Sequence, residues 1–178
     1  NNKLSITRAR SICPNCTHEL SAIDLFPIFS WVFLRGKCRY CKKPISWQYP
    51  IVELSTAILF VASYVFWPET LNASGIFHLV IWLISVVGFM ALIVYDLRWL
   101  ILPNKIIFPL IGLAVMGILA DSLIFDGGIN AITEATTGLL IGGGIFYLLF
   151  HVSDGKWIGG GDVKLGFLLG LLIGGVTK

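Results

Sequence analysis

Charged residues are scarce in this chain of 178 residues. Asp, Glu, Lys and Arg together make up 13% of it, whereas hydrophobic residues make up 56%. Because about a quarter of the residues in a soluble domain are charged, this composition excludes an ordinary soluble globular protein. We therefore expect an all-α, polytopic integral membrane protein that lies in a lipid bilayer and carries a small cytoplasmic domain.

Several other signals are missing. No short basic stretch leads into an apolar core with a small-residue cleavage site, so the sequence shows no signal peptide. No strand-like alternation appears, and no glycine-rich nucleotide loop follows a strand. The first residue is Asn1 rather than Met, and the chain stops at Lys178 within an apolar segment. We expect that both ends belong to a longer protein and that at least one further membrane helix lies beyond them.

All four cysteines lie in the polar first fifty residues. Cys13 and Cys16 form one CxxC unit, Cys38 and Cys41 form another, and 21 residues separate the two units. Two such turns aim four thiolates at one point, which is the ligand set of a structural zinc site, although this separation is just longer than usual. Two disulfides would need an oxidising compartment, and a thioredoxin-like motif would need only one CxxC. The pattern therefore predicts structural Zn²⁺.

Apolar runs of membrane-spanning length follow this polar segment. We assign residues 1–50 to a cytoplasmic zinc-binding domain and residues 51–178 to a transmembrane domain. A bilayer core needs about 20 apolar residues of helix. The predicted spans are residues 51–67, 76–95, 106–125, 132–151 and 163–178, the last of them truncated.

The basic residues are distributed unevenly along the chain. Eight of the thirteen Lys and Arg residues precede residue 50, the connections at 96–105 and 152–164 carry two each, and those at 68–75 and 126–131 carry none. Basic segments beside membrane helices mark the cytoplasmic side, which explains this pattern better than nucleic acid binding. The alternation predicts four crossings of a membrane, with Asp96, Asp162 and the zinc domain on the cytoplasmic side.

Two aspartates, Asp96 and Asp162, are the candidate catalytic residues because each lies where an apolar helix meets cytoplasmic solvent. Two carboxylates held close together can share one proton, so that one acts as a general base on water while the other polarises a scissile carbonyl. The glycines before Asp162 permit close approach of backbone or substrate. The alternative is that both aspartates cap helix ends, where carboxylates are common.

The motifs together resemble those of type IV prepilin peptidases. Cys13-Pro-Asn-Cys16, Arg35-Gly-Lys-Cys38-Arg-Tyr-Cys41 and Tyr49-Pro-Ile-Val-Glu53 resemble the family's zinc domain. Asp96-Leu-Arg-Trp-Leu-Ile-Leu-Pro103-Asn104 is similar to its first aspartate motif, with Pro103 at the expected offset. Gly159-Gly160-Gly161-Asp162 matches its GxGD motif, and Lys164 follows in the usual place. The resemblance covers nearly the whole chain.

This resemblance implies an intramembrane aspartyl protease of the bacterial cytoplasmic (inner) membrane. The peptidase domain, residues 51–178, would cut the basic leader from prepilins or pseudopilins at the cytoplasmic membrane face. Asp96 and Asp162 would be the catalytic pair, with Gly159, Gly161, Lys164 and Pro103 as supporting motif residues. Many family members also N-methylate the new N-terminus with S-adenosylmethionine. Glu53 would serve that step or orient substrate, or it would be a helix N-terminal carboxylate stabilised by the helix dipole.

Two other classes of protein fit part of the pattern. A transport protein would use Asp96 and Asp162 as ion ligands or proton-relay groups, and a membrane-anchored zinc-ribbon adaptor would need only the cysteines. Of the remaining residues, we expect packing or interface roles for His18, His78 and His151, and interfacial positions for Asp121 and Glu134. The glycines at four-residue spacing predict close helix packing: they are Gly138, Gly142, Gly166, Gly170 and Gly174.

Overall fold

The computed structural model describes residues 11–125 and 127–175, and the chain divides after Ile58 into two compact units. The first unit contains the 3-10 helix η1 (Ala22–Leu25), the short helix α1 (Phe29–Phe33) and the start of helix α2 (Gln48–Val65). In the described part of the chain there is no strand longer than an isolated bridge; two such bridges pair Ile12 with Glu19 and Lys37 with Pro44.

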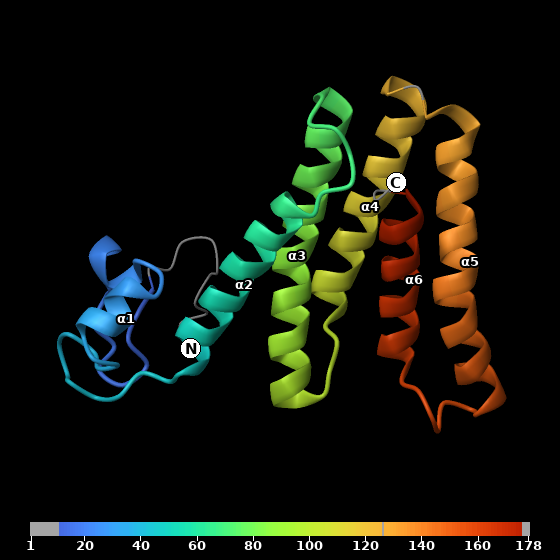
Figure 1. The fold of residues 1–178 in the computed structure, drawn as a ribbon. Coiled ribbons are helices and arrows are strands. Elements are labelled where there is room, and N and C mark those ends of the chain that lie inside the picture. Colours follow the sequence, from blue (N-terminus) through green and yellow to red (C-terminus); the bar gives the residue numbers. More distant parts are fainter. Residues whose placement is uncertain (1–10, 126, 176–178) are drawn as a thin grey trace. The chain divides into compact units, whose positions relative to one another are not determined.

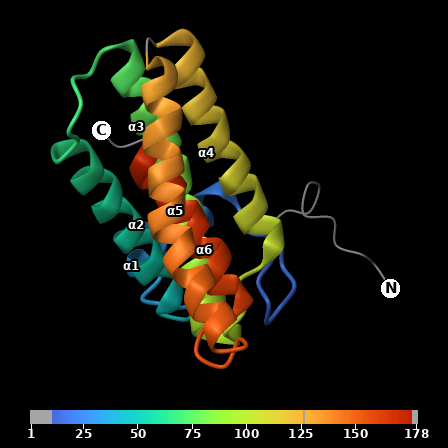
Figure 2. The same cartoon turned by 90° about the vertical axis from the view of Figure 1, so that its right-hand side faces the viewer.

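The second unit is a bundle of long helices. The rest of α2 leads into α3 (Ala73–Trp99), α4 (Asn104–Ile124), α5 (Gly128–Val152) and α6 (Gly160–Gly175), as Figures 1 and 2 show. Helix α3 has 27 residues, so it is about 40 Å long and exceeds the roughly 30 Å of a bilayer core. Its ends therefore reach the polar boundaries of a membrane.

The core of this bundle lies between α3, α4 and α6. Its fully or nearly buried members are Ile81, Leu92, Ile107, Leu110, Ala114, Leu168 and Leu172. Gly88 is needed at the contact of α3 with α4, because a Cβ there would meet the side chain of Leu110 at 2.5 Å. The core is therefore built by apolar residues from three helices, and a larger residue at Gly88 would require the Leu110 side chain to move.

Helices α5 and α6 pack through glycine. A Cβ on Gly138 would meet the carbonyl oxygen of Gly170, and a Cβ on Gly142 would lie 3.0 Å from that of Gly166. Small residues spaced by four let two helix backbones approach this closely, and the contact contains all five of the glycines picked out by their spacing. The close helix packing predicted from that spacing is confirmed.

The all-helical membrane fold is confirmed. Among the described residues, four helices, α2 to α5, are long and apolar enough to cross a membrane, and the chain is a multi-pass membrane protein. The helix ends differ from those predicted, because α3 continues through Asp96 to Trp99 and α6 begins at Gly160, before Asp162. Polar residues at a bilayer boundary remain helical, so the end of an apolar run is not the end of the helix. Residues 176–178 of the predicted last span lie outside the described residues.

Candidate active site and metal centre

The two CxxC units fold into turns with the same hydrogen bonds. The N–H of Cys13 donates to the carbonyl of His18, and the N–H of Cys38 donates to that of Lys43. The carbonyl of each cysteine then accepts from the residue four positions later, Thr17 or Lys42, and both of these residues have positive φ. Each turn thereby folds back on its first cysteine. The two turns have equivalent backbone structures, and each carries two thiols.

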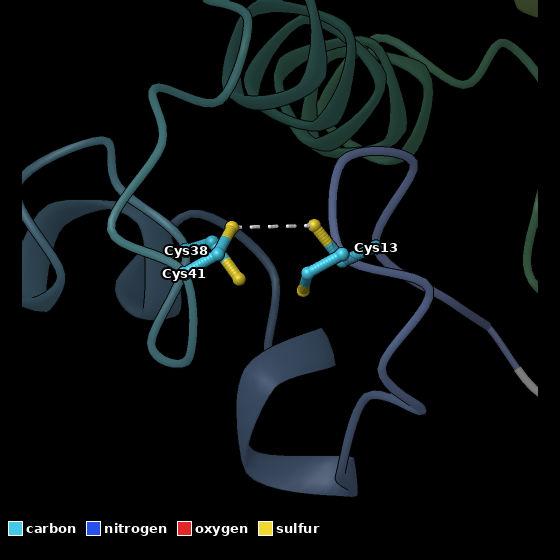
Figure 3. A group of neighbouring side chains, drawn as sticks. Cys13, Cys38 and Cys41 are labelled. Carbon is cyan, nitrogen blue, oxygen red and sulfur yellow. Dashed lines mark hydrogen bonds between the residues drawn. The ribbon is translucent and has the colours of Figure 1, made fainter.

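These turns bring the four sulfurs together. One Sγ atom from each of Cys13, Cys16, Cys38 and Cys41 lies within 4.8 Å of the others, and Figure 3 shows the labelled side chains converging between the two turns. Sulfurs bound at about 2.3 Å around one zinc ion would lie about 3.8 Å apart, close to the 4.0 Å between Cys13 and Cys41. A disulfide needs about 2.05 Å, and all four cysteines are free. The cluster therefore fits a tetrahedral metal ion.

The thiols in this cluster differ in acidity. Backbone N–H groups of Asn15 and Cys16 lower the pKa of Cys13 to about 7. At Cys16 the backbone N–H of His18 favours the thiolate, but desolvation and the neighbouring thiols raise the pKa to about 11. The Cys13 thiolate thus forms readily, and its charge opposes the deprotonation of Cys16. A divalent cation relieves this opposition, because metal binding requires the deprotonated ligands.

Asp24 fixes the second cysteine turn to η1. Its carboxylate accepts hydrogen bonds from the hydroxyl and backbone N–H of Ser21 and from Arg39 at 2.6 Å and Tyr40 at 3.2 Å. Desolvation alone would raise the pKa of Asp24, but these donors outweigh it and lower the pKa to about 2. Sequence reasoning missed Asp24, although the Ser-x-x-Asp spacing of a capping box, Ser21 to Asp24, could have identified it.

At one end of the helix bundle, the segments that contain the two aspartate motifs are in contact. Lys164 Nζ of α6 donates a hydrogen bond of 2.8 Å to the side-chain oxygen of Asn104, the first residue of α4. The ammonium group also lies 5.7 Å from the centre of the Phe108 ring. A Cβ on Gly161 would be 3.2 Å from Leu102, in the four-residue link between α3 and α4. The GxGD segment therefore lies against the end of the first aspartate motif.

Asp162 lies in the first turn of α6. Its carboxylate accepts a hydrogen bond of 3.0 Å from the backbone N–H of Gly159, while the carbonyl of Gly159 accepts from the N–H of Asp162. This pair of contacts is a reciprocal cap on the helix start, where a negative charge is also favoured by the helix dipole. Capping, the structural alternative for this residue, is therefore one role of Asp162.

Capping of a helix start does not explain the position of Asp96. It lies in the last turn of α3, is exposed, and precedes Leu100, whose N–H donates to the carbonyl of Asp96 at 2.8 Å. The C-terminus of a helix is the negative end of its dipole, so a carboxylate there is unfavourable where Lys or Arg would be favourable. The helix dipole therefore does not explain a carboxylate at Asp96, in contrast to Asp162.

Pro103 and Glu53, two further residues singled out from the sequence, have local roles in the structure. Pro103 is the N-cap of α4, and its carbonyl accepts from Ile106 and Ile107. Glu53 accepts a hydrogen bond of 2.7 Å from the backbone N–H of Ile28 and so attaches the start of α1 to α2. This contact gives Glu53 a structural role in the first unit.

A buried polar cluster at the other end of the bundle was missed by sequence reasoning. His78 in α3 has Nδ1 3.0 Å from Glu69 and Nε2 3.5 Å from Asp121 of α4. His78 and Asp121 are only 1% and 2% exposed, so Asp121 is buried within the protein near the end of α4. Glu69 lies nine residues before His78, but Asp121 is far from both in sequence and shares no motif with them. The pairing of α3 with α4 is what brings Asp121 to the cluster.

Comparison with known proteins fits these observations. A family model described as the bacterial peptidase A24 N-terminal domain matches residues 1–67, and one described as the type IV leader peptidase family matches residues 81–177. The chain belongs to the type IV leader peptidase family. The second match contains both aspartates and the contact between Lys164 and Asn104, and the first contains all four cysteines.

Several curated type IV leader peptidases are similar over most of this chain. A prepilin leader peptidase/N-methyltransferase of Aeromonas hydrophila is 35% identical over 93% of the chain and 54% of its own length. A prepilin leader peptidase/N-methyltransferase of Bacillus subtilis is 34% identical over 96% of the chain and 64% of its own length. A type 4 prepilin-like proteins leader peptide-processing enzyme of Escherichia coli is 33% identical over 97% and 61%. The chain thus spans little more than half the length of the relatives from Aeromonas and Escherichia. No solved structure matches it significantly.

Proposed function

We propose that this protein is a leader peptidase that cleaves prepilins or pseudopilins, with Asp96 and Asp162 as its catalytic pair. The observation that carries the proposal is the contact of two segments 60 residues apart, joined by the hydrogen bond between Lys164 and Asn104. The family membership supports the reaction class. The position of Asp96 at the unfavourable end of a helix supports its role in chemistry rather than in stability.

The reaction needs only the two carboxyl groups and water. One ionised carboxylate removes a proton from water, whose oxygen then bonds to the scissile carbonyl carbon, while the protonated carboxyl donates to the carbonyl oxygen. The tetrahedral intermediate collapses as the carbon–nitrogen bond breaks, and the first carboxyl gives the leaving amine the proton that it removed from water. The second carboxylate takes a proton back from a hydroxyl of the intermediate, so both groups return to their starting states. Neither a covalent enzyme intermediate nor a bound metal is part of this sequence of steps.

The proposed substrate has two parts that match the two environments at this end of the bundle. A basic leader remains in the aqueous phase, and an apolar helix lies in the bilayer, so the scissile bond falls at the membrane boundary. Arg98, Lys105, Lys156 and Lys164 lie in or beside the two links at this end, whereas the links at the other end carry no Lys or Arg. The positive-inside rule therefore supports a cytoplasmic location for the proposed active site.

A processing assay tests this function. The protein would be expressed with a prepilin in a bacterial strain that lacks its own prepilin peptidase, and the pilin N-terminus would be determined by mass spectrometry. We expect a shortened pilin that begins at the junction of the leader and the apolar helix. An unprocessed pilin, in membranes where the protein is present and folded, would refute the proposal and favour the transport or adaptor alternatives.

N-methylation of the new N-terminus with S-adenosylmethionine is a second proposed activity. Its support is that relatives which are 35% and 34% identical carry the name prepilin leader peptidase/N-methyltransferase. In the same assay, methylation would add the mass of one methylene group to the processed pilin. Cleaved pilin without that added mass would leave the peptidase proposal standing and remove this one.

We also propose that the four cysteines hold one structural Zn²⁺. Four thiolates fill a tetrahedral site and leave no position for water, so the ion would stabilise the first unit rather than take part in hydrolysis. Elemental analysis of the purified protein should give one zinc per chain, and Cys16→Ala or Cys41→Ala should lose it. His18→Phe is the matched control, because the His18 ring contacts that of Tyr40 beside the cluster and His18 supplies no ligand to it. Full zinc content in a cysteine variant would contradict the assignment.

A further inference from the structure

Large apolar side chains are exposed along the short segment that contains η1 and α1. Neither element has a buried residue, and the side chain of Phe33 is 82% exposed. Six exposed residues make up what we call the apolar ridge: Ile23, Leu25, Phe26, Phe29, Val32 and Phe33. The rings of Phe26 and Phe29 lie 5.6 Å apart and join its two halves. A continuous apolar patch of this kind marks a contact with a membrane or another protein.

The ridge has a fixed orientation on its own unit. Trp31 attaches α1 to the rest of the domain, because its Nε1 donates to the carbonyl of Ile45 at 3.3 Å and its ring lies 4.0 Å from that of Trp47. Phe29, Val32 and Phe33 are three and four residues apart and so share one face of the helix. One side chain of α1 is thus anchored on the domain, while this apolar face is left exposed.

A second contact places the ridge beside the start of a membrane helix. Ile28, just before α1, has φ of 60°, which is unusual for a β-branched residue. Its N–H is held by Glu53, the sixth residue of α2 and thus about 9 Å along that helix. Near Glu53, Ile51 and Leu54 of α2 are also exposed, and only 6% of this candidate span is buried within the protein. The ridge therefore lies beside a helix surface that is itself apolar and uncovered.

The charge next to the ridge points to one kind of partner. Five basic residues follow it within nine positions: Arg35, Lys37, Arg39, Lys42 and Lys43. Between residues 11 and 47 the acidic residues are Glu19 and Asp24, and Asp24 is paired with Arg39. Aromatic and aliphatic side chains beside a cluster of Lys and Arg are typical of segments that lie in the interface of an anionic membrane.

We propose that the apolar ridge inserts into the boundary between headgroups and acyl chains of the leaflet that α2 enters, with anionic phospholipid as its partner. The membrane then holds the first unit at two places, the ridge and α2. The exposed aromatic residues Trp47 and Tyr49, at the start of α2, lie where aromatic belts form. This inference depends on the membrane location of α2 and not on the peptidase chemistry, so either can fail without the other.

Photo-crosslinking in a bilayer tests the inference. The photoreactive residue p-benzoylphenylalanine would replace Phe33, Phe29 or the exposed control Lys43, in full protein reconstituted into nanodiscs of phosphatidylglycerol and phosphatidylethanolamine. Equal zinc content in the three variants would verify that the first unit is folded. After irradiation, mass spectrometry would identify each adduct. We expect lipid adducts at positions 33 and 29, several-fold more than at 43, and fewer when the lipid is phosphatidylcholine alone.

Every other result overturns the inference. Equal lipid labelling at positions 33 and 43, or no lipid adduct at 33, would show that the ridge is outside the bilayer. Adducts to residues 59–178 would identify the ridge as a contact with the second unit of the same chain. Adducts to a second copy, or to an added prepilin, would identify it as a protein interface.

Discussion

Lys164 Nζ and the side-chain oxygen of Asn104 are 2.8 Å apart, and this hydrogen bond joins the start of α6 to the start of α4. Lys164 is two residues after Asp162, and Asn104 follows the link in which Leu102 contacts Gly161. The bond therefore helps to fix the relative position of the two segments that contain the proposed catalytic pair. Small displacements of reacting groups are costly in enzymes, which makes this contact a test of the geometry.

Removal of either partner should slow leader cleavage. A hydrogen bond to a charged but accessible group contributes about 1 kcal/mol, so Lys164→Met and Asn104→Leu should each lower kcat/KM roughly five-fold. The double variant should be no worse than either single variant, because both remove the same bond. Lys105→Met, an exposed lysine next to Asn104, is the control and should be close to normal. Additive losses would show that the two residues act separately.

The buried cluster of Glu69, His78 and Asp121 should govern stability. His78→Phe removes the imidazole that faces both carboxylates, and a buried polar group left without its hydrogen-bond partner costs about 1–3 kcal/mol. We expect a lower midpoint for unfolding in mixed micelles of mild detergent and SDS. His151→Phe is the matched control, because His151 is exposed and stacked on Tyr147. Equal midpoints for the two variants would contradict the role assigned to His78.

The glycine contact between α5 and α6 should not tolerate a methyl group. In Gly170→Ala the new Cβ would meet the carbonyl oxygen of Gly138, which belongs to a backbone and cannot rotate away. Overpacking of this kind costs about 1–3 kcal/mol, so we expect weaker resistance to heat in detergent. Gly144→Ala in α5 is the control, since a Cβ there meets nothing within 4 Å. A stable Gly170→Ala protein would show that the two helices are not this close.

Asp24 should hold the second cysteine turn in place. Asp24→Asn keeps the size of the side chain but removes the charge that Ser21, Arg39 and Tyr40 contact, so a chelator should extract zinc faster. Because folding lowers the pKa of Asp24 to about 2, its stabilising effect is complete above the unfolded value of about 4 and is lost as the pH falls from about 4 to about 2. Asp154→Asn, an exposed change outside this unit, should leave the extraction rate unchanged. An unchanged rate in Asp24→Asn would show that the network does not support the site.

Local sequence patterns were sufficient to predict most of the fold and the metal cluster. Two CxxC units specify their turns by themselves, and apolar runs of bilayer length specify α2 to α5, so both were predictable. The helix ends were not, because Asp96 and Asp162 are polar residues inside helices that extend beyond their apolar runs. The pairing of His78 with Asp121 was not predictable either, since it depends on how α3 and α4 lie side by side.

The catalytic assignment of Asp96 and Asp162 is tested most directly by the cleavage rate of three Asp→Asn variants in the same membranes. Loss of a general acid or base lowers the rate by about a thousand-fold, so Asp96→Asn and Asp162→Asn should each abolish leader cleavage while the protein remains folded. Asp154→Asn is the control: it lies in the link before α6 at positive φ, which Asn tolerates, and should cleave normally. Cleavage at the normal rate by either of the first two variants would contradict the assignment.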